Sequence, residues 1–382
     1  MNLLKGSLQD ELDLFFKNIN STEFEERYVS KAAFSKARAN LSHTTFIDAN
    51  ENLVNSFYEK VDYRKWNGFR LTAIDGSTLK LPPSQYVSDH FGRRIPSEVP
   101  QAKISSRFDV LNKVCLELLV DPWNGDERNM AHRHLEHVEN HDLILYDRGY
   151  PCFSLYADHK KRNSQFVMRL AKNWSKETIA FETSNARDKT IEIYPHRPET
   201  KQRCLDNNVS TESVKVRLLK VKLPTGEDEL LITSLLDKSA HPLGVFKDLY
   251  SLRWGIEEDY KTKKVWMEYE NFSGKSAESV LQDIFAKMYA QNIVAVISFA
   301  AKPLIDKNCK DRKYEYQTNQ PQALSKIKNN LFKLTKRSAI SLMTSLIHIF
   351  SITIEPIRPN RKEKRKHKIR KRTFYPQYKT IR

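Results

Sequence analysis

The feature that most constrains the fold is a pair of apolar segments that each end in an aspartate close to a glycine. Residues 69–75 read Phe-Arg-Leu-Thr-Ala-Ile-Asp before Gly76, and residues 141–147 read His-Asp-Leu-Ile-Leu-Tyr-Asp before Arg148 and Gly149. Both predict a buried strand whose end presents an acid beside a flexible turn, a setting suited to metal binding. A lone Asp before Gly is more often a plain turn residue, but two matched settings weaken that interpretation.

Strand and helix patterns alternate around these segments. Residues 103–120 predict a hairpin around Asn112-Lys113, residues 126–137 and 153–159 predict helices, and residues 165–170 predict another strand. This alternation indicates an α/β domain, with a sheet and flanking helices.

The remaining sequence divides into further regions. From 171 to 234 the helical pattern disappears, and 190–194, 214–223 and 228–233 alternate as strands do, which predicts a β-rich insertion. Helical patterns return at Pro242, over 277–301 and over 323–350. We therefore expect a helical N-terminal region (1–66), a first part of the α/β domain (67–170), the insertion (171–235), a second part of the domain (236–310), a helical C-terminal region (311–357) and a basic tail (358–382).

The stretch from 250 to 264 predicts a helix with an ordered polar stripe. On a wheel of about 100° per residue with Tyr250 at zero, Arg253 falls near 300°, Glu257 near 340° and Lys264 near 320°. A single carboxylate is thus bracketed by groups that bind phosphate oxygens, over about four turns. The stripe suits a carboxylate that holds a metal next to a polyanion. The alternative is a solvated helix face with incidental charges.

Asp75, Asp147 and Glu257 would repel one another if they were close together. Hard divalent cations relieve such repulsion, and Mg²⁺ is the natural occupant. Two such ions about 3.5–4 Å apart can activate a water and stabilise the leaving oxygen at phosphorus. We therefore expect a site for two Mg²⁺ ions, with Mn²⁺ as a possible substitute.

The positive charge of the chain indicates a polyanionic partner. Lys and Arg number 64 against 47 acids, a formal net charge of +17, and twelve of these cations lie between Arg358 and Arg382 beside one acid. Nucleic acid is the first expectation and an anionic membrane surface the second. Such a tail, including Arg365, Lys366 and Arg370, would add affinity that falls steeply with salt. The segment from Lys31 to Arg38, N-capped by Ser30, predicts a short basic helix that could contact DNA, form a dimer contact or simply pack.

Other classes of function are disfavoured. Four scattered cysteines without a CxxC pair argue against a structural zinc site and a disulfide framework, and fit a reducing compartment. The N-terminus lacks a signal-peptide run, and the apolar stretch 293–301 is too short to span a bilayer, so we expect a soluble cytoplasmic protein. No P-loop and no Ser-centred nucleophile elbow occur. Four histidines could bind metal, but their charged neighbours favour an exposed helix: His132, His134, His137 and His141.

Three blocks of the sequence together resemble a known protein family. The pattern Tyr250-x2-Arg253-x3-Glu257-x6-Lys264 resembles the C-terminal signature of the DDE transposases of bacterial insertion sequences, specifically the IS-four family, at all four positions. Ala-Ile-Asp75-Gly-Ser and Tyr-Asp147-Arg-Gly-Tyr resemble the blocks around the first and second Asp of that family. The resemblance covers nearly the whole chain, from about residue 20 onward, although only these three blocks are specific.

The resemblance implies a ribonuclease-H-like catalytic domain, with Asp75, Asp147 and Glu257 as the metal-binding triad. The implied reaction is cut-and-paste transposition: water attacks at the element ends, the freed 3′-OH forms a hairpin on the opposite strand, and the reopened end joins target DNA. Tyr250, Arg253 and Lys264 would grip phosphates near the scissile bond, and Arg148 would contact DNA beside Asp147. Members that make hairpins stack a flipped base on an aromatic residue, for which Trp174 is the candidate although it lies early in the insertion.

The expected partners follow from the same resemblance. They are the terminal inverted repeats, the target DNA and a second copy of the chain in the DNA complex, with 323–350 as the candidate dimer surface and a bacterial, nucleoid-associated location. Two other functions remain open: an immobile DNA-binding remnant that acts as a repressor, and a general metal-dependent nuclease. The first would lack cleavage, and the second would cleave without specific terminal sequences.

Overall fold

A computed structural model describes residues 7–222, 226–328, 330 and 339–358. The chain forms two compact units. The sheet unit comprises Asp62–Ser77 and Lys103–Tyr260, and the helical unit comprises Met1–Val61, Thr78–Ala102 and Lys261–Arg382. Arg365, Lys366, Arg370 and the rest of the tail beyond Arg358 lie outside the described residues, so their expected DNA contacts stay predictions.

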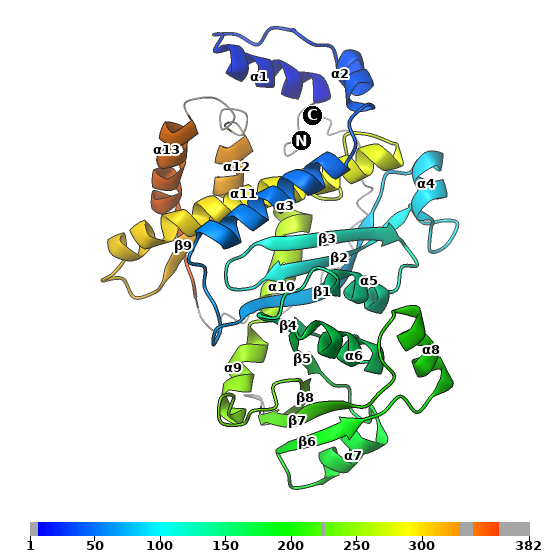
Figure 1. The fold of residues 1–382 in the computed structure, drawn as a ribbon. Helices are drawn as coiled ribbons and strands as arrows, with labels where there is room; N and C mark the ends of the chain where they lie inside the picture. The colour runs from blue at the N-terminus through cyan, green and yellow to red at the C-terminus, as the bar shows by residue number, and fades with distance from the viewer. Residues whose placement is uncertain (1–6, 223–225, 329, 331–338, 359–382) are drawn as a thin grey trace. The chain divides into compact units, whose positions relative to one another are not determined.

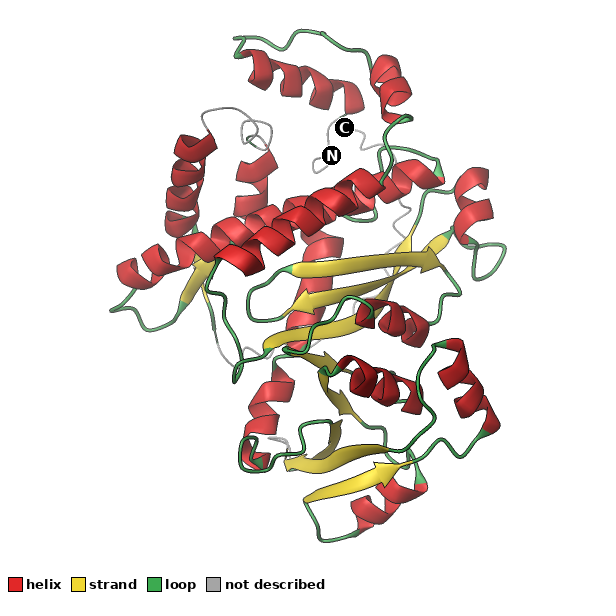
Figure 2. Ribbon diagram, viewed as in Figure 1, coloured by secondary structure: helices red, strands yellow, loops and turns green. Residues whose placement is uncertain are grey.

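One mixed sheet dominates the sheet unit (Figures 1 and 2). Its strand order is β3-β2-β1-β4-β5-β8-β7-β6. Strands β1, β4 and β5 run parallel, whereas β5–β8, β8–β7 and β7–β6 pair antiparallel. The bounds are β1 Arg70–Lys80, β2 Gln101–Asp109, β3 Cys115–Pro122, β4 Asp142–Tyr146, β5 Gln165–Arg169, β6 Asp188–Ile193, β7 Val214–Lys222 and β8 Asp228–Thr233. The predicted α/β class and the hairpin over 103–120 are confirmed.

Helices α5 (Glu127–Leu135) and α6 (Phe153–Arg162) pack on one face of this sheet. Alternate strand residues such as Ile74, Ile144 and Tyr146 face these helices and form a continuous apolar core with them. The predicted helices over 126–137 and 153–159 are therefore confirmed. The residues between these alternate positions lie on the opposite face, and this face receives Asp75.

The prediction that 171–234 lacks helices is wrong. This segment contains α7 (Lys176–Thr183) and α8 (Pro198–Asp206). A Ser175 capping box starts α7 and Pro198 occupies the first turn of α8, signals that the polar composition of both helices obscured. The three predicted strands exist as β6–β8, but they extend the main sheet beyond β5 rather than forming a sheet of their own.

The helical unit is built around α11 (Ala277–Asn308), which runs beside α3 (Thr44–Lys60) in Figure 1. Asn292 donates to the Asn50 side chain at 2.6 Å, and Phe57 meets Phe299 edge to face. Helix α11 is longer than the apolar stretch 293–301 suggested and has the length and composition of a membrane span. However, 72% of its most apolar window is buried inside the protein, as in a core helix.

The remaining elements flank this pair. The predicted helix from Lys31 to Arg38 is confirmed as α2, and the Ser30 hydroxyl accepts from the Ala33 N–H as its N-cap. The predicted helix over 323–350 corresponds to two described helices, with residues 329 and 331–338 undescribed between them. The other bounds are α1 Leu8–Asn20, α4 Gln85–Phe91, α12 Gln320–Lys328, α13 Ala339–Ile352, and the antiparallel strands β9 Tyr316–Thr318 and β10 Ile354–Pro356.

Candidate active site

Two adjacent parallel strands bring Asp75 and Asp147 to the same level of the sheet. Strands β1 and β4 pair with Ala73 opposite Leu145, so two further residues on each strand lead to the two acids. Neighbouring strands lie about 4.8 Å apart, which places both carboxylates in one locality. One detail of the prediction is wrong, because β1 does not end at Asp75 but continues to Lys80. Asp147 does follow the end of its strand, as expected.

The predicted single helix over 250–264 is interrupted. Helix α9 (Phe246–Ser251) is followed by tightened turns at Leu252 and Arg253, where backbone N–H groups donate to carbonyls three residues earlier. Helix α10 (Trp254–Lys261) then passes into a π-helical turn over Thr262–Trp266. These changes of winding shift the side chains away from a uniform wheel.

Most of the predicted stripe still converges on the acids. The buried Tyr250 hydroxyl donates to the Tyr146 carbonyl oxygen at 3.1 Å and lies 3.5 Å from Asp147 Oδ1. Arg253 Nη2 donates to Glu257 Oε1 at 2.9 Å. The cation of Arg253 also acts electrostatically on both aspartates. The sheet unit therefore gathers Asp75, Asp147, Tyr250, Arg253 and Glu257.

Lys264 belongs to the helical unit, where its ammonium donates to the Thr78 carbonyl oxygen at 2.9 Å. Burial lowers the pKa of this ammonium, and the nearby Glu270 carboxylate partly opposes that effect. The structure thus gives Lys264 a partner within its own unit.

The carboxyl group of Asp75 has a strongly perturbed acidity. Burial raises its pKa to about 6, and the negative charges of Glu127 and Asp147 add to the rise. The Gly76 N–H, which donates to Asp75 Oδ1 at 2.9 Å, and the Arg253 cation oppose it. Burial is therefore the main cause of the raised pKa of Asp75.

We expect Asp75→Asn to stabilise the metal-free protein. Between about pH 4 and pH 6 the folded state keeps a proton on Asp75 that the unfolded state has lost, so the wild type loses stability as pH rises through this window. The variant lacks this loss. Its advantage should grow from pH 4 to 6 and then stay constant at about 1–3 kcal/mol.

Urea denaturation in EDTA at several pH values measures this difference. Asp248→Asn, which alters an exposed acid in the first turn of α9, serves as the control. If Asp75→Asn is no more stable than the wild type at pH 8, then ionised Asp75 does not destabilise the folded metal-free protein, and this prediction is wrong.

The donor set fits a divalent cation. Carboxylate oxygens are the ligands that hard cations prefer, and a bound cation would favour the ionised form of Asp75, whose pKa is raised by burial and, to a smaller extent, by the charges of Glu127 and Asp147. Over the described part of the chain, however, no three His, Cys, Asp or Glu side chains stand close enough together to hold a metal. Glu257 is instead paired with Arg253, so cation binding would require that ion pair to open.

Sequence reasoning missed two acids and one base in this locality. Glu127, in the first turn of α5, acts on Asp75 electrostatically. Arg169, at the end of β5, places Nη1 at 4.0 Å from Asp147 Oδ1 and pairs through Nε with Glu229 at 3.0 Å. The sequence predicted the two strands that precede Asp147 and Arg169. The structure adds that they pair in parallel with Tyr146 level with Met168, which places Arg169 beside Asp147.

The residues proposed to contact DNA differ in their surroundings. Arg148 and Lys31 are exposed and available. Trp174 is partly buried, packs against the apolar core and has its ring centroid 6.1 Å from that of Tyr156, so its stacking on a flipped base stays a prediction.

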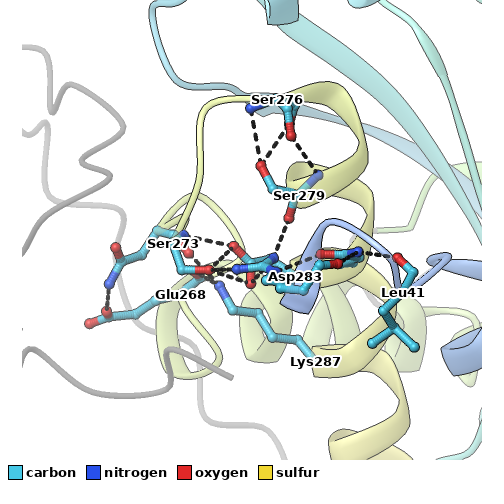
Figure 3. A network of polar contacts seen from close by, with 10 residues as sticks. Leu41, Glu268, Ser273, Ser276, Ser279, Asp283 and Lys287 are labelled. Atoms are coloured by element: carbon cyan, nitrogen blue, oxygen red, sulfur yellow. Dashed lines mark hydrogen bonds and ion pairs between the residues drawn. The ribbon is translucent and has the colours of Figure 1, made fainter. Parts of the chain in front are cut away.

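Arg38 has the packing role that the sequence left open as one alternative for its helix. Its guanidinium donates to Ser273 and Gln282, to the Ser279 carbonyl oxygen at 2.7 Å and to Asp283 at 3.1 Å, which anchors α2 to the start of α11. Figure 3 shows this network. These bonds engage the side chain and favour the packing alternative, and a DNA contact of Arg38 stays a prediction.

The histidine cluster is also structural. His132 contacts Asp158 at 2.6 Å and Ser154 at 3.0 Å, and His134 contacts Glu117 at 2.6 Å. Both rings are buried, so the predicted exposed helix is wrong for them, whereas His137 is exposed. The sequence could not reveal these partners because they come from β3 and α6.

A pair of parallel strands that presents two aspartates beside a glutamate, an arginine and a tyrosine is an arrangement typical of phosphoryl-transfer enzymes that use divalent ions. Residues 66–293 match the family model described as "Transposase DDE domain", which is more than half of the chain, and the chain belongs to this family. The resemblance to the IS-four family of insertion-sequence transposases is thereby confirmed.

A curated relative supports the same family. The chain is 24% identical over 281 residues to the transposase InsG for insertion sequence element IS4 of Escherichia coli (strain K12). This alignment covers 70% of the chain and spans 61% of the length of that relative. Among solved structures, the piggyBac transposase in a synaptic complex with hairpin DNA has a TM-score of 0.42 at 10% identity, over 89% of this chain and 75% of the other.

Proposed function

We propose that this protein is a cut-and-paste DNA transposase whose sheet unit is a ribonuclease-H-like catalytic domain. The observation that carries the proposal is the level placement of Asp75 and Asp147 on adjacent parallel strands, in the same unit as the Arg253–Glu257 pair. The strand order β3-β2-β1-β4-β5, with the last three strands parallel, agrees with such a domain. The helical regions before and after it, at 1–66 and 311–357, and the tail would serve DNA and partner binding.

Asp75, Asp147 and Glu257 would hold two Mg²⁺ ions, or Mn²⁺ in their place. When bound, such ions activate an attacking oxygen and stabilise the leaving oxygen at phosphorus. The carboxylates must be ionised to bind them, and the Tyr250 hydroxyl, protonated because burial raises its pKa, keeps Asp147 oriented.

Arg253 would exchange partners in this scheme. In the structure its guanidinium neutralises Glu257. Once the Glu257 side chain leaves Arg253 to bind a divalent cation, the Arg253 guanidinium would be free to bind a phosphate oxygen of the DNA next to the cleaved bond. The acid is thus kept paired until DNA and metal arrive together. Lys264 and Arg148 would add further phosphate contacts.

The hairpin step needs an aromatic side chain that can stack on a flipped base, and Trp254 is better placed than Trp174. Its indole is 57% exposed, beside Arg253 and one turn before Glu257 on α10. Base–aromatic stacking contributes about 1–3 kcal/mol, so Trp254→Ala should reduce hairpin formation about 5- to 150-fold while the first nick is preserved.

Gel separation of nicked and hairpin products from a labelled element end measures this effect. Trp254→Phe should restore most of the hairpin, and Trp123→Ala, which removes a partly exposed indole after β3, is the matched control. Equal loss of nick and hairpin in Trp254→Ala would assign the residue to DNA binding or folding instead.

Terminal inverted repeats, target DNA and a second copy of the chain are the proposed partners, since joining requires two ends to be held together. An excision assay tests the function: a reporter plasmid carries the DNA that flanks the gene, and wild type is compared with Glu257→Gln. Precise excision by the wild type alone is the expected result. Binding without excision would favour the immobile remnant, and cleavage without regard to the terminal sequence would favour a general nuclease.

A further inference from the structure

Glu127 lies against Gly76, the residue that follows Asp75, where the chain leaves room for it. A Cβ atom placed on Gly76 would stand 2.7 Å from Glu127 Cδ, so only glycine allows the carboxyl group to lie against the backbone that follows Asp75. Glu127 Oε1 also pairs with the Lys103 ammonium at 2.9 Å, which fixes the orientation of the side chain. Both partners belong to the sheet unit. The glycine after Asp75 therefore admits a fourth acid rather than ending the strand.

Tyr150 supplies a second, independent observation at the same place. Its side chain is 2% exposed, and its hydroxyl has no hydrogen-bond partner among the described residues. Burial raises the pKa of this phenol well above its ordinary value, and the charges of Asp75, Glu127 and Asp147 raise it further. An unsatisfied buried hydroxyl costs about 1–3 kcal/mol, so a native protein rarely keeps one without a use. All three carboxylates act on this hydroxyl electrostatically, and it is a donor without a partner among the described residues.

We propose that Glu127 and Tyr150 belong to the divalent-cation site: Glu127 contributes a carboxylate oxygen to the ion on the Asp75 side, and the Tyr150 hydroxyl donates a hydrogen bond to the ligands of that ion. The inference rests on the proposed function, since it extends the Asp75 and Asp147 site. It gives the buried Tyr150 hydroxyl, which has no partner among the described residues, a hydrogen-bond acceptor when the ion is bound. It also supplies a carboxylate for the ion while Glu257 is still paired with Arg253.

Mn²⁺ binding to the full chain without DNA tests this inference separately from transposition. Free Mn²⁺ is measured by electron paramagnetic resonance during titration, and thermal melting with and without Mn²⁺ is recorded in parallel. Glu127→Gln should weaken binding roughly tenfold or more, as losses around metal sites do. Glu199→Gln, which removes an exposed acid from the first turn of α8, should bind as the wild type does.

Tyr150→Phe separates a binding role from a structural one. Because the hydroxyl has no partner in the described part of the chain, its removal should leave the melting temperature in EDTA unchanged or higher, yet Mn²⁺ should bind several-fold more weakly and raise the melting temperature less. Glu127→Asp keeps the charge but shortens the reach, and should bind nearly as weakly as Glu127→Gln.

The inference is overturned if Glu127→Gln and Tyr150→Phe both bind Mn²⁺ with wild-type affinity. It is also overturned if Glu127→Asp does so, because a negative charge near the ion would then be enough and no direct contact from Glu127 would be needed. Asp75→Asn and Asp147→Asn distinguish this failure from that of the proposed function. If they abolish binding while the Glu127 and Tyr150 variants do not, only the further inference fails. If they too bind normally, the triad itself is wrong.

Discussion

Asp147→Asn should reduce strand cleavage at the element end by at least about a thousandfold while DNA binding is retained. The substitution keeps the size of the side chain and its contact with the Tyr250 hydroxyl, but removes the negative charge that would hold a divalent ion. Because such an ion stabilises the charge developing at phosphorus by several kcal/mol, its loss affects the chemical step far more than binding. Asp75→Asn and Glu257→Gln should behave alike. Single-turnover cleavage and a mobility-shift titration on one labelled duplex measure both quantities.

Glu258→Gln is the matched control for Glu257→Gln. It removes an exposed acid one position further along α10, rotated away from Arg253, and should leave cleavage within a few-fold of wild type. Residual cleavage above about a tenth of the wild-type rate in any of the three variants would remove that residue from the triad. Parallel loss in Glu258→Gln would instead point to damage of the helix.

Short-range patterns predicted the strands that carry the site. The apolar runs before Asp75 and Asp147 predicted β1 and β4, and their pairing in register places the two acids level. The Tyr250 to Glu257 spacing predicted that a phenol, a guanidinium and a carboxylate come together, which the structure bears out through contacts to Asp147 and between Arg253 and Glu257. These successes depend on local periodicity and on spacing within one element.

The errors arise where distant segments decide the outcome. Gly76 was interpreted as a turn residue, whereas it lies within β1 and its missing side chain makes room for Glu127, some fifty residues later. Burial of His132 depends on Asp158 from α6. For the helix that carries Arg38 the sequence could not choose between a DNA contact, a dimer contact and packing, because the partners of Arg38 lie at the start of α11. No window of neighbouring residues contains this information.

An ion pair at the other end of the two strands sets the level of the acids. Arg70 and Asp142 are register partners, and each lies five residues before one of the aspartates, Asp75 and Asp147 respectively. Arg70 Nε and Nη2 donate to the two Asp142 oxygens at 2.5 and 2.8 Å, and Arg107 adds a contact at 3.5 Å. The Asp142 side chain is fully buried and that of Arg70 is 5% exposed. A one-residue slip of β1 against β4 would break this pair and separate the acids.

Asp142→Ala should therefore lower the free energy of unfolding by about 3–5 kcal/mol, because it leaves the Arg70 cation buried without its main counter-ion. Urea denaturation should show a lower midpoint with an unchanged slope. Asp121→Ala is the matched control. It breaks an ion pair with Arg133, whose side chain is 46% exposed, and should lower the free energy of unfolding by less than about 1 kcal/mol. If Asp142→Ala lowers the free energy of unfolding as little as Asp121→Ala does, then packing rather than this ion pair holds β1 level with β4. A large loss would show that this pair contributes to holding β1 and β4 together in the register that places Asp75 level with Asp147.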